Sequence, residues 1–383
     1  MIRTQWRFVT LVAGGLLLAS GMTVIAQDEK KEENKDAPAA TEAKPAEPAP
    51  EAPKPTVEIV HLDNPSGVAI HPVTKQIFVV SHGPTTDGSG AVFRLVRGKP
   101  RKLYLEVEGF PTDVYGKGPM YNIGPLGCTF WGNDRLIVAD GSRKDGEEFV
   151  RIYKIEEAVP EKPRKEDAAE FTLGPIAPGD LSPKGEGNFY GVVVWNDAIY
   201  VTSNGDDTKG WIAKAPIADG KPGTLTPTIA TKEATEVDAP IAITLSPDKS
   251  QLVVSQGGEV NVAGDSLLTF YDAEGKLAKK YKTGLNDITG LAYSPKGKLY
   301  AVDFSWVDPA QGGLFELVIE GEEVKPKKIL SLDRPTSLAF DADGALYVTV
   351  FGLGDLYKAP AGTDAAEEEK KPKGGLVRLE PGL

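Results

Sequence analysis

Three oxygen-bearing side chains stand at the ends of repeated β-strands and could together hold a hard divalent cation. Asp140, Asn204 and Asp303 end the segments LIVAD, YVTSN and LYAVD. Calcium prefers carboxylate and amide oxygens and takes about six to eight oxygen ligands. These three residues could therefore hold a divalent cation such as calcium beside these strands. The alternative is that each side chain accepts hydrogen bonds from nearby backbone amides, as Asp and Asn often do at strand ends.

A second set of side chains carries hydroxyl, amide, imidazole and aromatic groups at equivalent positions or in the loops beside them. These predicted ligand-binding residues are His82, Tyr190, Gln256, Thr289, Trp306 and Phe351. His82 could act as a general base, since the unperturbed pKa of histidine lies near neutrality. The alternative for His82 is a surface loop residue without a chemical role. The aromatic side chains could bind a ligand or pack against one another.

A pattern that recurs six times after residue 56 gives these residues a common location. In each copy a short apolar strand has a small residue in its second or third place. A polar turn and a second strand rich in β-branched and aromatic residues follow. The turns contain Pro, Asn, Asp and Gly, which favour tight hairpins. The first strands begin at Ser66, Leu126, Tyr190, Ile241, Thr289 and Thr336.

A third and a more polar fourth strand follow in most copies, and the copies are spaced 47 to 64 residues apart. Four antiparallel strands at this period are typical of propeller blades. The sequence therefore predicts an all-β fold, a six-bladed β-propeller over residues 56–383, rather than a β-sandwich. The sixth copy lacks a fourth strand, and TVEIVHL at 56–62 is left over. We expect this segment to close the ring as the outer strand of blade six, which removes an exposed edge.

The antiparallel order also predicts where a site lies. The ends of all second strands and the starts of all first strands must share one face of the ring. The candidate residues therefore converge on one mouth of the central channel. Several long loops containing glycine lie on this face, and loops on a rigid scaffold commonly carry recognition.

The repeats resemble those of six-bladed propellers of the NHL and regucalcin/gluconolactonase-like group over roughly residues 56–383. The resemblance implies a metal in the channel that polarises a lactone carbonyl and activates water. The metal set of gluconolactonase-like propellers is a Glu early in the first blade, two Asn and an Asp. Asn204 and Asp303 match this set, whereas the first blade, which begins NPSGVAI, has no such Glu.

Composition narrows the classes of function. The chain has 383 residues, with 43 Lys and Arg against 55 Asp and Glu, and its formal charge of −12 argues against nucleic-acid binding. Cys128 is the single cysteine, which excludes an intrachain disulfide and a cysteine-based zinc cage. The three histidines argue against a His-rich metal or haem site.

Residues 1–26 have the features of a secretory signal peptide: Arg3 and Arg7 precede an apolar run that ends in Val-Ile-Ala. We therefore expect export to the periplasm or the extracellular space. No later segment reaches the length of an apolar membrane span, so no stable span is expected after cleavage. Residues 27–55 lack Val, Ile, Leu and aromatic residues and are rich in Ala, Pro, Glu and Lys. This composition predicts a disordered linker.

Two classes of function are consistent with these patterns. The first, which we favour, is a non-enzymatic binding protein that recognises a small molecule or a protein partner at the channel mouth. The second is a divalent-metal-dependent hydrolase of the lactonase or esterase type. A quinone-dependent sugar dehydrogenase of the same architecture is less favoured, since at most one histidine and no basic cluster are expected at the mouth.

Overall fold

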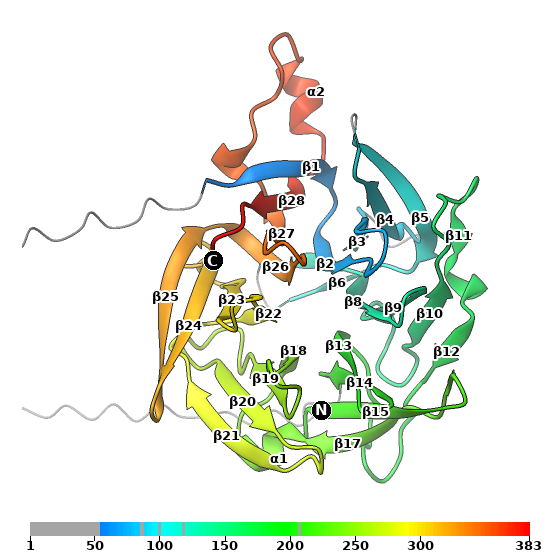
Figure 1. Ribbon diagram of the computed structural model, residues 1–383, viewed down its shortest axis with the longest axis vertical. Helices are drawn as coiled ribbons and strands as arrows, with labels where there is room; N and C mark the ends of the chain where they lie inside the picture. The colour runs from blue at the N-terminus through cyan, green and yellow to red at the C-terminus, as the bar shows by residue number, and fades with distance from the viewer. Residues whose placement is uncertain (1–53, 85–87, 99–100, 117–118, 206–207) are drawn as a thin grey trace, which may run out of the picture. The chain divides into compact units, whose positions relative to one another are not determined.

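Six antiparallel β-sheets surround a central channel in the computed structural model (Figure 1). The structure describes residues 54–84, 88–98, 101–116, 119–205 and 208–383. The residues from Glu51 onward form one compact unit. The predicted signal peptide and nearly all of the predicted linker lie outside the described residues. The all-β class and the six-bladed propeller predicted from the repeats are confirmed.

The strands of each blade follow one another outward from the channel. Blade one comprises β2 (Pro65–Ile70), β3 (Ile77–Ser81), β4 (Gly90–Val96) and β5 (Lys102–Phe110). Blade two comprises β8 (Pro125–Trp131), β9 (Arg135–Asp140), β10 (Val150–Lys154) and β12 (Phe171–Leu173). Blade three comprises β13 (Phe189–Trp195), β14 (Ala198–Ser203), β15 (Trp211–Ala218) and β17 (Thr226–Ala230).

The second half of the ring repeats this order. Blade four comprises β18 (Pro240–Leu245), β19 (Leu252–Gln256), β20 (Leu267–Tyr271) and β21 (Leu277–Lys282). Blade five comprises β22 (Ile288–Tyr293), β23 (Leu299–Asp303), β24 (Gly313–Glu320) and β25 (Glu323–Ser331). Blade six comprises β26 (Asp333–Phe340), β27 (Leu346–Gly352), β28 (Gly374–Leu379) and β1 (Thr56–Leu62).

Several short strands and helices lie outside the four-stranded pattern of the blades. The strand β11 (Arg164–Lys165) pairs in parallel with β5, and β16 (Lys221–Pro222) pairs with β15. A separate hairpin, β6 (Asp113–Tyr115) and β7 (Tyr121–Ile123), lies between blades one and two in the chain. The α-helices are α1 (Thr231–Thr235) and α2 (Ala365–Glu369), and no helix in the described ranges is long and apolar enough to cross a membrane.

The ring closes through its first strand, as the sequence predicted. β1 pairs antiparallel with β28, with Val57 opposite Val377, and is therefore the outer strand of blade six. Figure 1 shows the two ends of the propeller side by side, β1 in blue and β28 in red. Ile59 and Leu62 of β1 are buried in a cluster with Leu376. Closure thus covers the edge of β28 and adds apolar packing between the two ends of the propeller.

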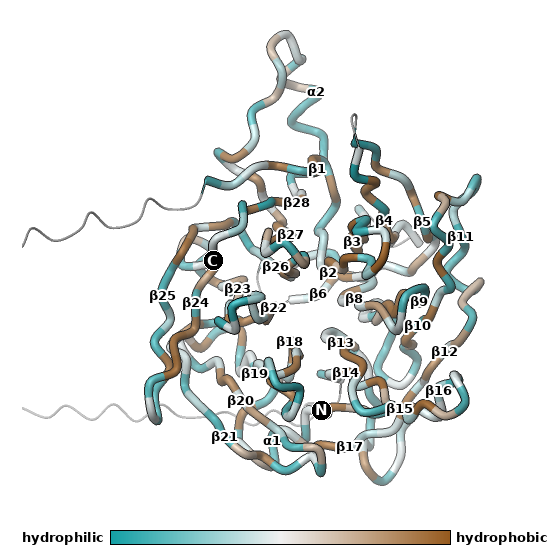
Figure 2. Tube along the Cα trace, viewed as in Figure 1, coloured by the Kyte–Doolittle hydropathy of each residue, from teal (hydrophilic) through white to brown (hydrophobic). Residues whose placement is uncertain are grey.

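The second strand of every blade is buried along its length. These strands are β3, β9 from Leu136 onward, β14, β19, β23 and β27. Neighbouring blades cover both faces of these strands, which is why the sequence there shows continuous apolar runs rather than alternation. Figure 2 shows apolar segments along the strands, whereas turns and outer loops are more hydrophilic. The core is therefore divided among the interfaces between blades.

The small residue in each first strand lets neighbouring blades approach at the channel. A Cβ atom at Gly127 would lie 2.0 Å from the Tyr190 carbonyl oxygen, and one at Gly191 would lie 2.5 Å from the Ile241 oxygen. Hydroxyl groups bridge other junctions by donating to a carbonyl of the next blade. These hydrogen bonds are Ser66–Leu126, Thr202–Ile241, Ser255–Ile288, Thr289–Pro335 and Thr336–Pro65.

Candidate functional site

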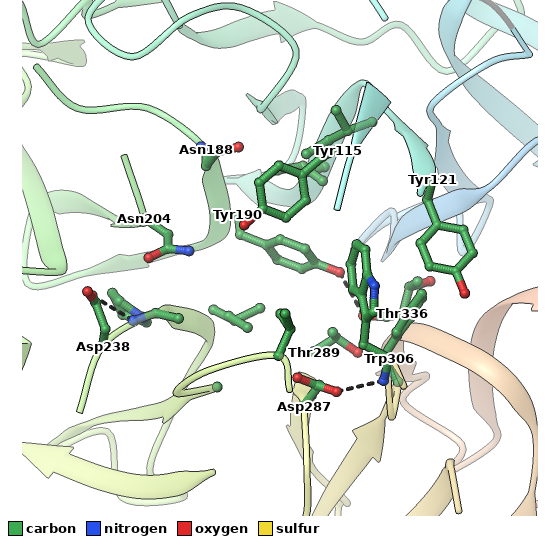
Figure 3. A pocket seen from close by; sticks show the side chains of 18 of the residues that line it. Tyr115, Tyr121, Asn188, Tyr190, Asn204, Asp238, Asp287, Thr289, Trp306 and Thr336 are labelled. Atoms are coloured by element: carbon green, nitrogen blue, oxygen red, sulfur yellow. Dashed lines mark hydrogen bonds between the residues drawn. The ribbon is translucent and has the colours of Figure 1, made fainter. Parts of the chain in front are cut away.

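A cavity of about 420 Å³ opens at the face where second strands end and first strands begin (Figure 3). All six blades contribute to its lining, and the hairpin β6–β7 adds Tyr115 and Tyr121. The face predicted from the antiparallel order is therefore the face that holds the cavity. Its volume lies within the range of about 300–1,000 Å³ that is usual for small-molecule sites.

A β-bulge lies at the start of every first strand, and in blades two to six a residue of the bulge lines this cavity. The pairing register between first and second strands shifts at the same place in all six blades. Bulges leave a residue unpaired and redirect its side chain, and they are common beside functional sites. The residues inside these shifts include Leu126, Tyr190, Ile241, Thr289 and Thr336, which all line the cavity.

Tyr190 forms the floor of the cavity. Its side chain reaches from blade three across the channel to blade six, where the hydroxyl donates to the Thr336 carbonyl oxygen at 3.2 Å. Tyr190 also lines a second cavity of about 370 Å³ further along the channel, beside Cys128. Burial raises the pKa of Tyr190, so the hydroxyl keeps its proton and remains a donor. Tyr190 and Thr289 line both cavities and therefore lie where the two cavities meet.

Aromatic rings from three separate parts of the chain cover one side of the cavity. This aromatic wall consists of Tyr115, Tyr121, Phe304, Trp306 and Phe351. Trp306 lies at its centre, with ring centroids of Tyr121 at 4.8 Å, Phe304 at 5.3 Å and Tyr115 at 5.9 Å. The indole N–H of Trp306 donates to the Pro119 carbonyl oxygen at 3.0 Å, which ties blade five to the β6–β7 hairpin.

Asp287, at the entry to β22, is the most unusual carboxyl group of the cavity. Only 6% of the residue is exposed, and its Oδ2 accepts the Trp306 backbone N–H at 2.6 Å. Burial raises the pKa of Asp287 to about 7, and the nearby charges of Asp303 and Asp265 add to this effect. A carboxyl group with such a pKa exchanges its proton near neutral pH.

Other acids join Asp287 in the lining. Asp145, Asp238 and Glu259 line the cavity, whereas none of its described lining residues is Lys or Arg. Asp238 is paired with Lys232, with 2.8 Å between Oδ2 and Nζ. The cavity therefore combines an aromatic wall with an acidic side.

His82 lines the cavity but is only 5% exposed, so the interpretation as a surface loop histidine is wrong. Its Nδ1 is 2.7 Å from the Asn122 carbonyl oxygen, an arrangement in which Nδ1 carries the proton. Nε2 is buried and has no partner among the described residues. Burial lowers the pKa of His82 to about 4, against the opposing effect of the Asn122 bond. A histidine with a hidden Nε2 and this pKa is poorly suited to act as a general base.

The structure brings five of the six predicted ligand-binding residues to the cavity: His82, Tyr190, Thr289, Trp306 and Phe351. Gln256 does not line it, although the next residue does. The Gln256 side chain is fully buried and donates to Thr235 Oγ1 at 3.0 Å and to the Val237 carbonyl. Gln256 therefore anchors the segment after α1 instead of facing a ligand.

Of the three predicted metal ligands, Asn204 lines the cavity, and Asp140 and Asp303 do not. Asp140 accepts from the Ser142 hydroxyl at 2.6 Å and pairs with Arg143. Asp303 accepts three backbone N–H groups, at 2.8–3.1 Å. Among the described residues, no group of three or more His, Cys, Asp or Glu could hold a metal ion. The two carboxylates thus take the alternative role, that of closing local turns.

The sequence contained a signal for the acids and amides that were missed. Asn188, Asp238 and Asp287 each stand two or three residues before the start of a first strand, and all three line the cavity. An alignment of the six repeats that includes the three residues before each first strand would have shown this recurring Asp or Asn. Asp145 and Glu259 lie in loops, and Tyr115 lies in the added hairpin strand β6; none has a repeat counterpart, so the pattern could not place them.

The fold and the cavity define the class of this chain as a six-bladed β-propeller with a ligand-sized chamber at one mouth of its channel. Neither a family profile nor a curated protein matches the sequence. Similar solved structures include a putative oxidoreductase (glucose dehydrogenase) from Thermus thermophilus, with 16% identity and a TM-score of 0.54. That match covers 86% of this chain and 100% of the other.

Two further structures have the same architecture. A putative gluconolactonase is 13% identical, with a TM-score of 0.51, over 86% of this chain and 93% of its own. A luciferin-regenerating enzyme is 12% identical, with a TM-score of 0.52, over 86% of this chain and 96% of its own. The fold similarity to gluconolactonase-like propellers expected from the repeats is confirmed. At these identities the similarity shows the fold and does not assign an activity.

Proposed function

We propose that this chain is an exported β-propeller that binds a small molecule in the cavity at the loop face of its channel. The observation that carries the proposal is the cavity itself, with Tyr190 as its floor and the aromatic wall at its side. A concave site of this size suits a small molecule better than a protein loop, because it can bury most of the surface of a small ligand.

Replacement of Trp306 tests this proposal, because the indole is the centre of the aromatic wall. We expect a thermal-shift and fluorescence screen of small metabolites to find ligands that bind the wild-type protein. Trp306→Leu should weaken their binding at least about tenfold, as expected for loss of a central aromatic contact. Trp131→Leu is the matched control, since Trp131 ends β8 at the opposite, turn-side end of the strand. Equal loss of binding in both variants would contradict the proposal that the ligand binds in the cavity.

Export is part of the same proposal and is supported by the sequence of residues 1–26 alone. Expression of the full chain in a bacterium followed by fractionation and N-terminal sequencing tests it. We expect mature protein that begins at Gln27 outside the cytoplasm. Protein that keeps Met1 and stays in the cytoplasm would contradict export without affecting the ligand site.

A second candidate function, hydrolysis of a lactone or ester, is favoured by Asp287. A carboxyl group in the cavity with a pKa near neutrality can take a proton from water. The similarity to a putative gluconolactonase supports this candidate at the level of the fold. Because Asp140 and Asp303 are engaged in local hydrogen bonds, the residues predicted to hold a divalent cation do not fit such a group, and no step is assigned to one.

The two candidates separate in a turnover assay. Hydrolysis predicts that lactone or ester substrates are consumed by the wild-type protein and that Asp287→Asn loses about 100-fold or more in rate. Pure binding predicts saturable binding without turnover. Absence of turnover across a lactone and ester panel would remove the hydrolase candidate and leave the binding function in place.

A further inference from the structure

One oxygen atom of Asp287 has no partner in the part of the chain that the structure describes. Its Oδ2 accepts the Trp306 backbone N–H, whereas its Oδ1 makes no hydrogen bond or ion pair with the residues that the structure describes. Figure 3 shows this second oxygen on the side of the carboxyl group turned away from Trp306. Oδ1 is still reached from the cavity, but only 6% of Asp287 is exposed, so this acceptor has lost part of its solvation, which costs free energy. A bound ligand that donates to Oδ1 would remove this cost.

The charges around the cavity favour a positive ligand. Four carboxyl groups, those of Asp145, Asp238, Asp287 and Glu259, line it, and Asp303 lies directly behind Asp287. Lys232 pairs with Asp238, so this carboxyl group already has a counter-charge, whereas none of the described lining residues is Lys or Arg. A concave site lined with one sign of charge attracts the opposite sign and repels its own. Anionic ligands are therefore disfavoured.

The aromatic wall suits the same ligand. Trp306 contributes both its backbone N–H, which orients Asp287, and its indole ring, which packs against Tyr121 and Tyr115. The faces of Trp and Tyr rings attract cations within about 6 Å of the ring centre. The wall already contacts one cation, because Arg334 lies over the Tyr121 ring at 5.5 Å and pairs with Asp333.

We propose, building on the proposed ligand-binding function, that the ligand carries a protonated amine that donates a hydrogen bond to Asp287 Oδ1 beside the aromatic wall. A neutral polyol could also donate to this oxygen, but it would bring no positive charge to the Asp287 carboxyl group. A charged N–H group supplies both the donor and the charge, and such charge-assisted bonds are stronger than neutral ones. The remainder of the ligand occupies the chamber above Tyr190.

Three probes that share one ring and differ in charge test this inference by calorimetry on the full mature chain. The probes are phenethylamine, 2-phenylethanol and phenylacetate. We expect phenethylamine to bind at least about tenfold more tightly than 2-phenylethanol, and phenylacetate not to bind. Asp287→Asn keeps the acceptor for the Trp306 N–H and should lose about tenfold in phenethylamine affinity, with 2-phenylethanol unchanged.

Asp219→Asn is the matched control, because it removes the same charge from an exposed turn whose positive φ Asn also tolerates. Unchanged phenethylamine binding in this variant, with weaker binding in Asp287→Asn, supports the proposal. Equal binding of the amine and the alcohol, or equal amine binding by wild type and Asp287→Asn, overturns it. Binding of neutral methyl β-D-glucoside without any amine binding also overturns it, and that result leaves the proposed ligand-binding function standing.

Discussion

Replacing His82 with Asn should flatten the acid sensitivity of the folded state. The Asn side chain keeps an N–H group for the Asn122 carbonyl oxygen but has no ring to protonate. In the wild-type protein burial lowers the pKa of His82 from 6.5 to about 4. The unfolded chain therefore takes up a proton below about pH 6.5, whereas the folded protein does so only near pH 4. Wild-type stability must fall as the pH drops through this window.

The size of this loss of stability follows from the difference between the pKa of His82 in the unfolded chain and in the folded protein. From about pH 8 to about pH 5, linkage through His82 lowers the free energy of unfolding by about 2 kcal/mol, rising to about 3 kcal/mol at pH 4 and below. Asp287, whose raised pKa of about 7 makes stability fall as the pH rises, contributes with the opposite sign. Because Asp287 is present in both proteins, its contribution cancels in the comparison of wild type with His82→Asn.

Urea unfolding at a series of pH values, followed by tryptophan fluorescence, measures this difference. The variant should be less stable at about pH 8, because the ring contact of His82 with Phe351 is lost. It should nevertheless lose about 2 kcal/mol less than wild type on going to about pH 5. The free energies of unfolding of the two proteins could instead change in parallel with pH, to within about 0.5 kcal/mol. This result would show that His82 titrates normally in the folded state, and it would refute the argument from the burial of His82.

Three further predictions concern the ring, each measured by urea unfolding. Gly127→Ala should lower the free energy of unfolding by at least about 2 kcal/mol, because its Cβ would lie 2.0 Å from the Tyr190 carbonyl oxygen. Gly179→Ala, whose Cβ would have its nearest atom at 3.9 Å, should be nearly neutral. Equal effects of the two substitutions would contradict the close approach of blades two and three. Tyr190→Phe should cost about 1 kcal/mol through the lost bond to Thr336, and no loss would argue against that bond. Removal of Thr56–Leu62 should abolish cooperative unfolding and promote aggregation through the bare β28 edge; a stable monomer would contradict closure by β1.

The fold could be predicted from the order of residues along the chain. Six repeats with hairpin turns specify six blades, because strand periodicity and turn chemistry are local properties of the chain. The missing fourth strand of the last copy identified Thr56–Leu62 as the closing strand. The antiparallel order fixed the face of the site, and it placed Tyr190, Thr289 and Phe351 at the cavity that the structure contains there.

The chemistry of the site, by contrast, depends on contacts between segments that are distant in the sequence. Asp140 and Asp303 look like metal ligands in sequence, yet nearby amides, a hydroxyl and a guanidinium group occupy their oxygens. Trp306 meets Pro119 across 187 positions of sequence, a contact that no local pattern encodes. Whether a polar atom faces a ligand or a neighbour depends on loops folded over the ring, and their contacts arise from packing between distant segments rather than from strand periodicity.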